Sequence, residues 1–201
     1  MKKESQVIFD KNVIEFVTVA AEFCAFLERA ESMKRSTFVD TTLKILPLLY
    51  LKASMLPKCE MIGDESPETY VTEEIYEVLR INLASILAEK DDYLEVFLPD
   101  MAYSDEPIKK NISEDLADIY QDIKDFIFVF QLGLNETMND SLAICQENFG
   151  LLWGQKLVNT MRALHDVKYS SKARGEDEEE EEYEPENNED CHCEDDDCHC
   201  H

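Results

Sequence analysis

The fold of this protein is decided by residues 112–135, which read ISEDLADIYQDIKDFIFVFQLGLN. Apolar side chains recur here at steps of three and four residues, which is the spacing of one face of an α-helix. They are Leu116, Ile119, Tyr120, Ile123, Phe126, Ile127 and Phe130. Because a helix with such a continuous apolar face must bury it, this segment predicts the organising helix of a core.

A second stripe on the same segment is acidic. It consists of Asp115, Asp118, Asp122 and Asp125. With about 3.6 residues per turn, these four carboxylates occupy a face separate from the apolar one. We interpret this face as solvated, and it also offers a surface to a cation or to a basic protein partner.

Working outward, the same periodicity predicts helices over residues 10–31, 36–56, 72–90 and 137–167. Asp10 and Thr72 are expected N-caps, and capping boxes are expected at Thr37/Asp40 and Thr137/Asp140. Pro47 is expected to kink or split its helix. The segment 58–70 reads as a loop, and 93–98 as helical or irregular. The prediction is an all-α fold, a single bundle of about five to six helices.

The last predicted helix contains two glycines four residues apart, Gly150 and Gly154, beside the only tryptophan, Trp153. Each glycine costs a helix about 1 kcal/mol, so a reason is expected. We favour close approach of a neighbouring backbone, and the alternative is room for a ligand beside Trp153. His165 is expected at the helix end, where a cation complements the helix dipole.

Composition divides the chain into a domain over residues 1–170, an acidic disordered spacer over 171–190 and a Cys/His-rich tail over 191–201. Of the 45 acidic residues, 15 fall from residue 175 onward, where there is no Lys or Arg. A segment of such low hydrophobicity and high charge cannot bury enough apolar surface to fold.

The formal net charge of −26 argues against nucleic acid and against an anionic membrane surface, since both require basic residues. Apolar runs fall short of the roughly 20 residues of a membrane span, and no secretory signal is recognisable. A cytoplasmic location is therefore expected. Seven cysteines, an odd number, do not form a complete disulfide framework.

Two segments carry a family resemblance, EDLADIYQDIKD at residues 114–125 and WGQKLVNTMRALHDV at residues 153–167. With AEFCAFLE at 21–28 and LPLLYLKASMLP at 46–57, they resemble a bacterial family known as domain of unknown function 5063. The likeness covers roughly residues 13–167. The resemblance implies an all-helical domain and supplies no activity, so it implies no catalytic residues.

The tail ends in two Cys-His-Cys clusters that contain the ligands zinc and copper prefer. Its candidate metal ligands are Cys191, His192, Cys193, Cys198, His199, Cys200 and His201. Four of these donors complete a tetrahedral zinc site, and paired thiolates suit Cu(I). Against a preformed site, the spacing matches neither zinc fingers nor ribbons.

An alternative metal site is suggested by Glu-x-x-Glu and Asp-x-x-Asp pairs, which helical nucleotide pyrophosphohydrolases use to hold Mg²⁺. The pairs here are Glu74 with Glu77, and either Asp115 with Asp118 or Asp122 with Asp125. No phosphate-binding loop, dinucleotide fingerprint or nucleophile elbow is present. We therefore expect a non-enzymatic binding or adaptor protein, acting with a basic partner or a metal-handling partner. The alternatives are a Mg²⁺-dependent hydrolase, or an acidic interaction module with an incidental tail.

Overall fold

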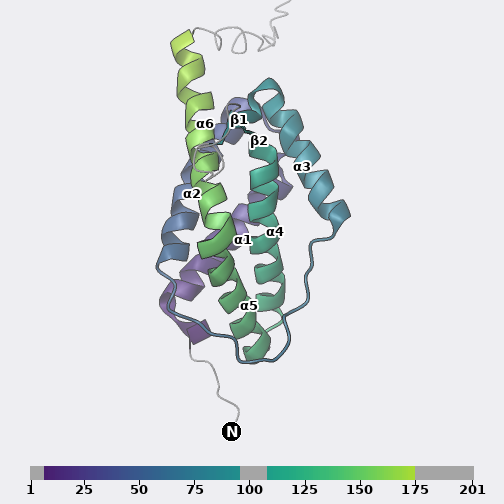
Figure 1. Ribbon diagram of the computed structural model, residues 1–201, viewed down its shortest axis with the longest axis vertical. Helices are drawn as coiled ribbons and strands as arrows, with labels where there is room; N and C mark the ends of the chain where they lie inside the picture. The colour runs from purple at the N-terminus through teal and green to yellow at the C-terminus, as the bar shows by residue number, and fades with distance from the viewer. Residues whose placement is uncertain (1–6, 96–107, 175–201) are drawn as a thin grey trace, which may run out of the picture.

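The computed structural model describes residues 7–95 and 108–174, with side chains described up to residue 170. These residues form an all-α bundle with one small hairpin (Figure 1). The helices are α1 (Lys11–Glu28), α2 (Arg35–Ser54), α3 (Glu73–Leu87), α4 (Ile112–Gln131), α5 (Asn135–Asn148) and α6 (Gly154–Arg174). The strands are β1 (Asp92–Leu94) and β2 (Lys109–Asn111). Short 3₁₀ turns span Val7–Phe9, Ala30–Ser32 and Ala88–Lys90, and a π-helical turn spans Phe149–Trp153.

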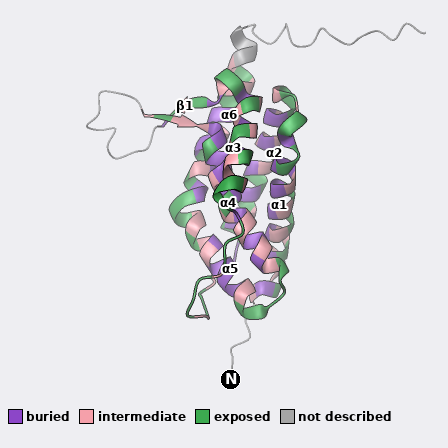
Figure 2. Cartoon of the chain, turned by 90° about the vertical axis from the view of Figure 1, so that its right-hand side faces the viewer, coloured by how far each residue is buried: buried purple, intermediate pink, exposed green. Residues whose placement is uncertain are grey.

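Helix α4 lies at the centre, as its apolar periodicity predicts. It packs against α1, α3, α5 and α6, and its buried side chains face all four neighbours. In Figure 2 the buried residues line the inner faces of the helices, and the exposed ones lie outside. Aromatic packing joins α4 to α1, where the rings of Phe16 and Phe126 are 5.5 Å apart. The core is therefore built around the segment that dominates the sequence pattern.

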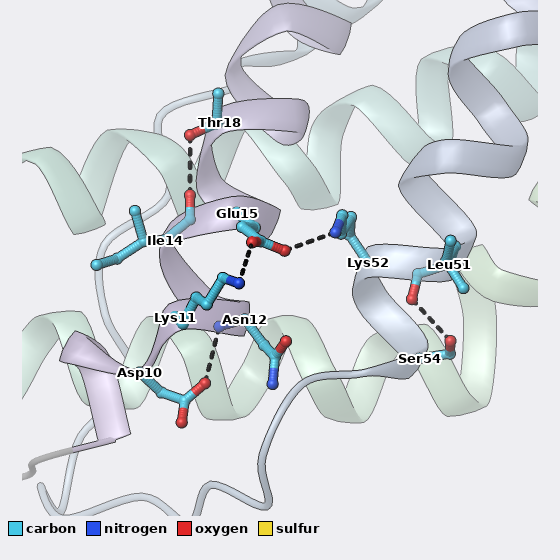
Figure 3. Close-up of polar contacts among 9 residues, drawn as sticks. All are labelled: Asp10, Lys11, Asn12, Ile14, Glu15, Thr18, Leu51, Lys52 and Ser54. Carbon is cyan, nitrogen blue, oxygen red and sulfur yellow. Dashed lines mark hydrogen bonds and ion pairs between the residues drawn. The ribbon is translucent and has the colours of Figure 1, made fainter.

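The predicted N-caps of α1 and α3 are confirmed. The Asp10 carboxylate accepts from the amide of Asn12 at 2.8 Å (Figure 3), and the Thr72 hydroxyl accepts from the amide of Ile75 at 3.3 Å. Figure 3 also shows Lys52 of α2 paired with Glu15 of α1 at 2.6 Å. This ion pair ties together two helices whose main contact is apolar.

Both predicted capping boxes are wrong. Asp40 lies inside α2, where its carboxylate is bound by Lys44 and by Lys168 of α6. Thr137 lies inside α5, and its hydroxyl donates to the carbonyl of Leu134. In each case a tertiary or local contact takes the side chain that a cap requires. Helix α2 also continues through Pro47 and is not split there.

The segment 93–98, which the sequence predicts to be helical or irregular, contains the end of strand β1, and its residues 96–98 lie outside the described residues. Tyr93 pairs with Lys110 of β2 in antiparallel register. Sequence reasoning misses the strand because its partner, Lys109–Asn111, is short and polar and shows no alternation of its own.

The helix predicted over residues 137–167 is three elements: α5, the π turn and α6. A π turn inserts one residue into a helix, so it shifts the face that later side chains present. Helix α6 then continues to Arg174, which places His165 well inside the helix rather than at its end. The ring of His165 contacts Tyr169 one turn later, at 4.5 Å.

The close approach expected at the glycines occurs at Gly154 only. A Cβ there would lie 2.3 Å from the carbonyl oxygen of Phe149, which stands one π turn earlier in the same continuous helical segment. At Gly150 a Cβ would meet no atom within 4 Å. The neighbouring backbone is therefore that of the π turn itself.

Within the described parts of the chain, no helix combines the length and the apolar character that a membrane crossing requires.

Candidate functional site

A cavity of about 360 Å³ lies between α4, α5, the π turn and the start of α6. The loop residues Pro67, Glu68 and Thr69 form its rim on the fourth side. Pockets that bind small molecules begin at about 300 Å³ and combine apolar walls with a few placed polar groups. This cavity has both features.

The floor of the cavity is apolar and buried. It is made by Phe126 and Val129 of α4, Cys145 of α5, and Trp153 at the end of the π turn. The indole of Trp153 is fixed because its nitrogen donates to the carbonyl of Cys145 at 3.1 Å. The π turn thus determines where this ring sits, and with it the depth of the cavity.

One wall carries two carboxylates of the acidic stripe, Asp122 and Asp125. Asp125 accepts through Oδ1 from the amides of Tyr70 and Val71, at 2.7 and 2.8 Å. Asp122 accepts through Oδ1 from the side-chain amide of Asn148 at 2.6 Å. In the described part of the chain these are the only hydrogen bonds of the two carboxylates, so each Oδ2 is left as an acceptor.

Asp118 stands one turn before Asp122 and is already neutralised. Its Oδ2 is paired with the ammonium of Lys156, and its Oδ1 accepts from the hydroxyl of Tyr76 at 2.9 Å. Lys156 and Asp118 both line the cavity. This end of the pocket is therefore charge-balanced, whereas the end at Asp125 is negative.

Burial shapes the electrostatics of this wall. Burial raises the pKa of Asp122, although the hydrogen bond from Asn148 opposes it and the nearby charge of Asp125 adds to it. Burial likewise raises the pKa of Asp125, against the two amides that stabilise its charged form. In both groups the main cause is burial, which disfavours the charged carboxylate, and Lys156 acts against the shift at Asp122.

The solvated face expected for the acidic stripe is therefore wrong. Asp115 is only 4% exposed and accepts from the hydroxyl of Tyr93, and the other three carboxylates are half-buried with donors from neighbouring elements. The periodicity locates the stripe correctly. It does not reveal that other helices and a loop cover the stripe, because those contacts come from distant parts of the chain.

When Asp115 and Asp118 are taken as the second pair, the four alternative Mg²⁺ ligands do not share a site, because each has a different environment. Glu74 is exposed on α3, and Glu77 is paired with Arg80 at 2.7 Å. Asp115 is held by the hairpin and Asp118 by Lys156. Among residues 7–95 and 108–170, no three Asp, Glu, His or Cys side chains are grouped so that they could hold a metal ion. The seven tail ligands, from Cys191 to His201, lie outside the described residues.

Sequence reasoning misses several residues of this pocket. Lys156, Asn148 and the rim residues 67–69 carry no pattern that links them to α4. The sequence feature that points to the pocket is the pair Gly150 and Gly154 beside Trp153. Room for a ligand is the less favoured of the two interpretations of that pair. The π turn places Trp153 in the lining of the cavity, which is the arrangement that interpretation requires.

Comparison with known proteins agrees with the helical architecture. A solved structure, the crystal structure of protein BF1032 from Bacteroides fragilis, is 92% identical to this chain. The match covers 84% of this chain and 99% of the other, with a TM-score of 0.76. No curated protein matches the sequence. The family described as "Domain of unknown function (DUF5063)" matches residues 7–170, which confirms the resemblance seen in the sequence. The chain therefore belongs to the DUF5063 family.

Proposed function

We propose that this domain is a non-enzymatic binding protein that holds a small organic cation in the pocket beside Trp153. The observation that carries the proposal is the wall formed by Asp122 and Asp125. One oxygen of each is fixed by a protein donor, and no Lys or Arg of the described chain is paired with either. Lys156, which also acts on Asp122, is paired with Asp118. Two preoriented, half-buried carboxylates with no ion pair of their own in the described chain favour a positively charged occupant.

The ligand chemistry is indicated by both parts of the lining. An ammonium or guanidinium group suits the carboxylates, since charge-assisted hydrogen bonds are the stronger kind. An apolar body suits the floor of Phe126, Val129 and Trp153. A free amine and a basic side chain of a protein partner share this chemistry.

Binding without reaction is supported by the two nucleophile types in the lining. Burial raises the pKa of the Cys145 thiol well above its usual value, which disfavours the reactive thiolate. The Ser141 hydroxyl donates to the carbonyl of Met138 at 3.0 Å rather than to a base. Within the described chain, neither side chain has the adjacent base that activates a nucleophile.

The test uses Trp153, which is the only tryptophan of the chain and therefore the sole source of indole fluorescence. Full-length protein is titrated with benzylamine and, in parallel, with benzyl alcohol, its neutral counterpart. We expect saturable binding of benzylamine and none of benzyl alcohol at equal concentration. Equal binding of both, or of neither, would overturn the proposal.

Substitution locates the cation. Asp122→Asn and Asp125→Asn preserve shape and remove charge, and each is expected to weaken benzylamine binding about tenfold, as loss of a charged hydrogen bond of about 1.5 kcal/mol implies. Glu22→Gln, an exposed position on α1, is the matched control and should bind as the wild type does. A capped Gly-Lys-Gly peptide in the same titration distinguishes a basic side chain from a free amine.

For the tail we propose transition-metal binding, with zinc or Cu(I) held by thiolates and imidazoles of residues 191–201. The support is the ligand chemistry of the two Cys-His-Cys clusters. This proposal is independent of the pocket.

A further inference from the structure

The rim of the pocket belongs to an unusually long connection. Between the end of α2 at Ser54 and the start of α3 at Glu73 the chain forms no helix or strand. In Figure 1 this connection runs around the lower end of the molecule, past α5, and rises to α3. Structureless loops of more than about 12–15 residues are uncommon in compact domains and are frequently functional.

The first half of the connection is fastened to α5. The carboxylate of Asp140, which is buried, accepts from the amides of Ile62 and Gly63 at 2.7 and 2.8 Å. Asn139 donates to the carbonyl of Glu60 at 2.8 Å. Because these bonds engage the backbone of the loop, they fix its path rather than the orientation of a side chain.

The second half is fastened to α4 through one group, Asp125. Its Oδ1 accepts from the amides of both Tyr70 and Val71. The same carboxylate lines the pocket. One side chain therefore bonds the loop through Oδ1 and lines the pocket, and its Oδ2 has no hydrogen bond in the described chain.

Residues 64–69, between the two fastened points, are the part we call the strap. Pro67 is partly buried and the others are exposed. Within the described chain, the strap makes no hydrogen bond of its own. Segments with few buried contacts and no hydrogen bonds open at low free-energy cost. The strap nevertheless supplies Pro67, Glu68 and Thr69 to the pocket.

We propose that the strap closes over the occupied pocket, with Asp125 as its latch and Glu68 as its contact to the bound cation. This inference rests on the proposed function. A ligand shifts a conformational equilibrium only through contacts that differ between the two states, and contacts to Pro67, Glu68 and Thr69 are of that kind. The coupling is reciprocal, so a strap that is fastened strengthens ligand binding.

The charge of Asp125 determines that ligand binding and strap closure reinforce each other. Two backbone amides bind a carboxylate more strongly than a neutral acid, because charge assists the hydrogen bond. Burial raises the pKa of Asp125, and a cation beside its second oxygen favours the charged form. The bound cation and the two backbone amides therefore both favour the charged form of Asp125.

The latch is tested without ligand by hydrogen exchange of the Tyr70 and Val71 amides in the full-length protein. Asp125→Ala is expected to accelerate their exchange at least tenfold. Asp122→Ala, one turn away on the same wall, has no bond to the amides of Tyr70 and Val71 and should change their exchange less than twofold. Asp125→Asn keeps an acceptor and should fall between, which serves if the alanine variant folds poorly. Equal exchange in the Asp125 and Asp122 variants would overturn the latch.

The coupling is tested with benzylamine on the wild type. Saturating benzylamine should slow exchange of the same two amides several-fold, and Glu68→Gln should weaken binding two- to threefold without changing exchange in the free protein. If benzylamine binds by Trp153 fluorescence but exchange is unaltered, the strap proposal is wrong and the proposed function stands. If benzylamine does not bind, both proposals fall, whatever the latch result.

Discussion

At the scale of single residues, the carboxylates of α4 show how one repeated residue type acquires different roles from its surroundings. Asp115 meets the hairpin, Asp118 meets Lys156, and Asp125 meets the loop before α3. All four acids have the same helical period, so their differences come only from the segments that pack against each turn. Asp115 is the most buried of them, and its titration provides a direct test.

Burial raises the pKa of Asp115 from 3.8 to about 6, with Tyr93 and Lys156 opposing the shift. The folded protein therefore holds this proton to higher pH than the unfolded chain does. Linkage then requires that the contribution of Asp115 to the free energy of unfolding falls as the pH rises from about 4 to about 6.

We predict that Asp115→Asn removes this penalty and keeps an acceptor for Tyr93. At pH 7 the variant should be more stable than the wild type by about 1–3 kcal/mol, and the difference should vanish near pH 4. Urea unfolding across this range measures it, with Glu22→Gln as the control. A difference that is constant with pH would show that Asp115 titrates alike in both states.

At the scale of elements, the π turn between α5 and α6 does most to create the site. It turns Trp153 onto the floor of the pocket and brings Lys156 to Asp118. Without it, α5 and α6 would be the single regular helix that periodicity predicts, and the side chains after residue 149 would face differently. Alanine substitution at Gly150 and at Gly154 separates the structural effect of the π turn from the low helix propensity of glycine.

Gly150→Ala should stabilise the protein by about 0.5–1 kcal/mol, because the position is open and alanine is the better helix former. Gly154→Ala should destabilise it by about 2 kcal/mol, because its Cβ would press on the backbone of Phe149. Thermal unfolding compares the two variants. The emission of Trp153 should shift in the second only, and a shift in both would mean that the turn does not depend on Gly154.

At the scale of the whole molecule, charge distinguishes the helical domain from the C-terminal segment. The chain has a net charge of −26, and a third of its acidic residues lie from residue 175 onward. Four of the seven cysteines and three of the four histidines also fall in the last eleven residues. The tail therefore combines soft metal ligands with an anionic surrounding that attracts cations.

We predict that the reduced full-length protein binds zinc or Cu(I) more tightly than micromolar, and that a chain ending at Arg174 does not. Competition titration with a chromophoric chelator measures both. Cys191→Ser with Cys193→Ser should weaken binding, whereas Cys59→Ser should not, since that thiol is half-buried against Asn139. Weak and equal binding by both lengths would remove metal handling from consideration.

The sequence alone determined the all-α class, the central place of α4, the caps at Asp10 and Thr72, and the membership of the family. The fold class, the place of α4 and the caps depend on local periodicity and on side chains that bond within a few residues of themselves, so they can be read from one segment at a time. The family follows from the resemblance of several segments to that family. The hairpin, the π turn and the failed capping boxes cannot be read in that way. Each depends on a partner distant in the chain or on the register of a whole helix.

The pocket was decided only by the tertiary structure. Its floor, its carboxylate wall and its rim come from α4, α5, α6 and the loop at residues 67–69, and no local pattern relates these segments to one another. Periodicity gives the direction in which Asp122 and Asp125 point along their own helix, but not which groups lie opposite them. The burial of Asp122 and Asp125, and their lack of an ion pair among the described residues, arise only when distant segments pack, because both are properties of the space between elements.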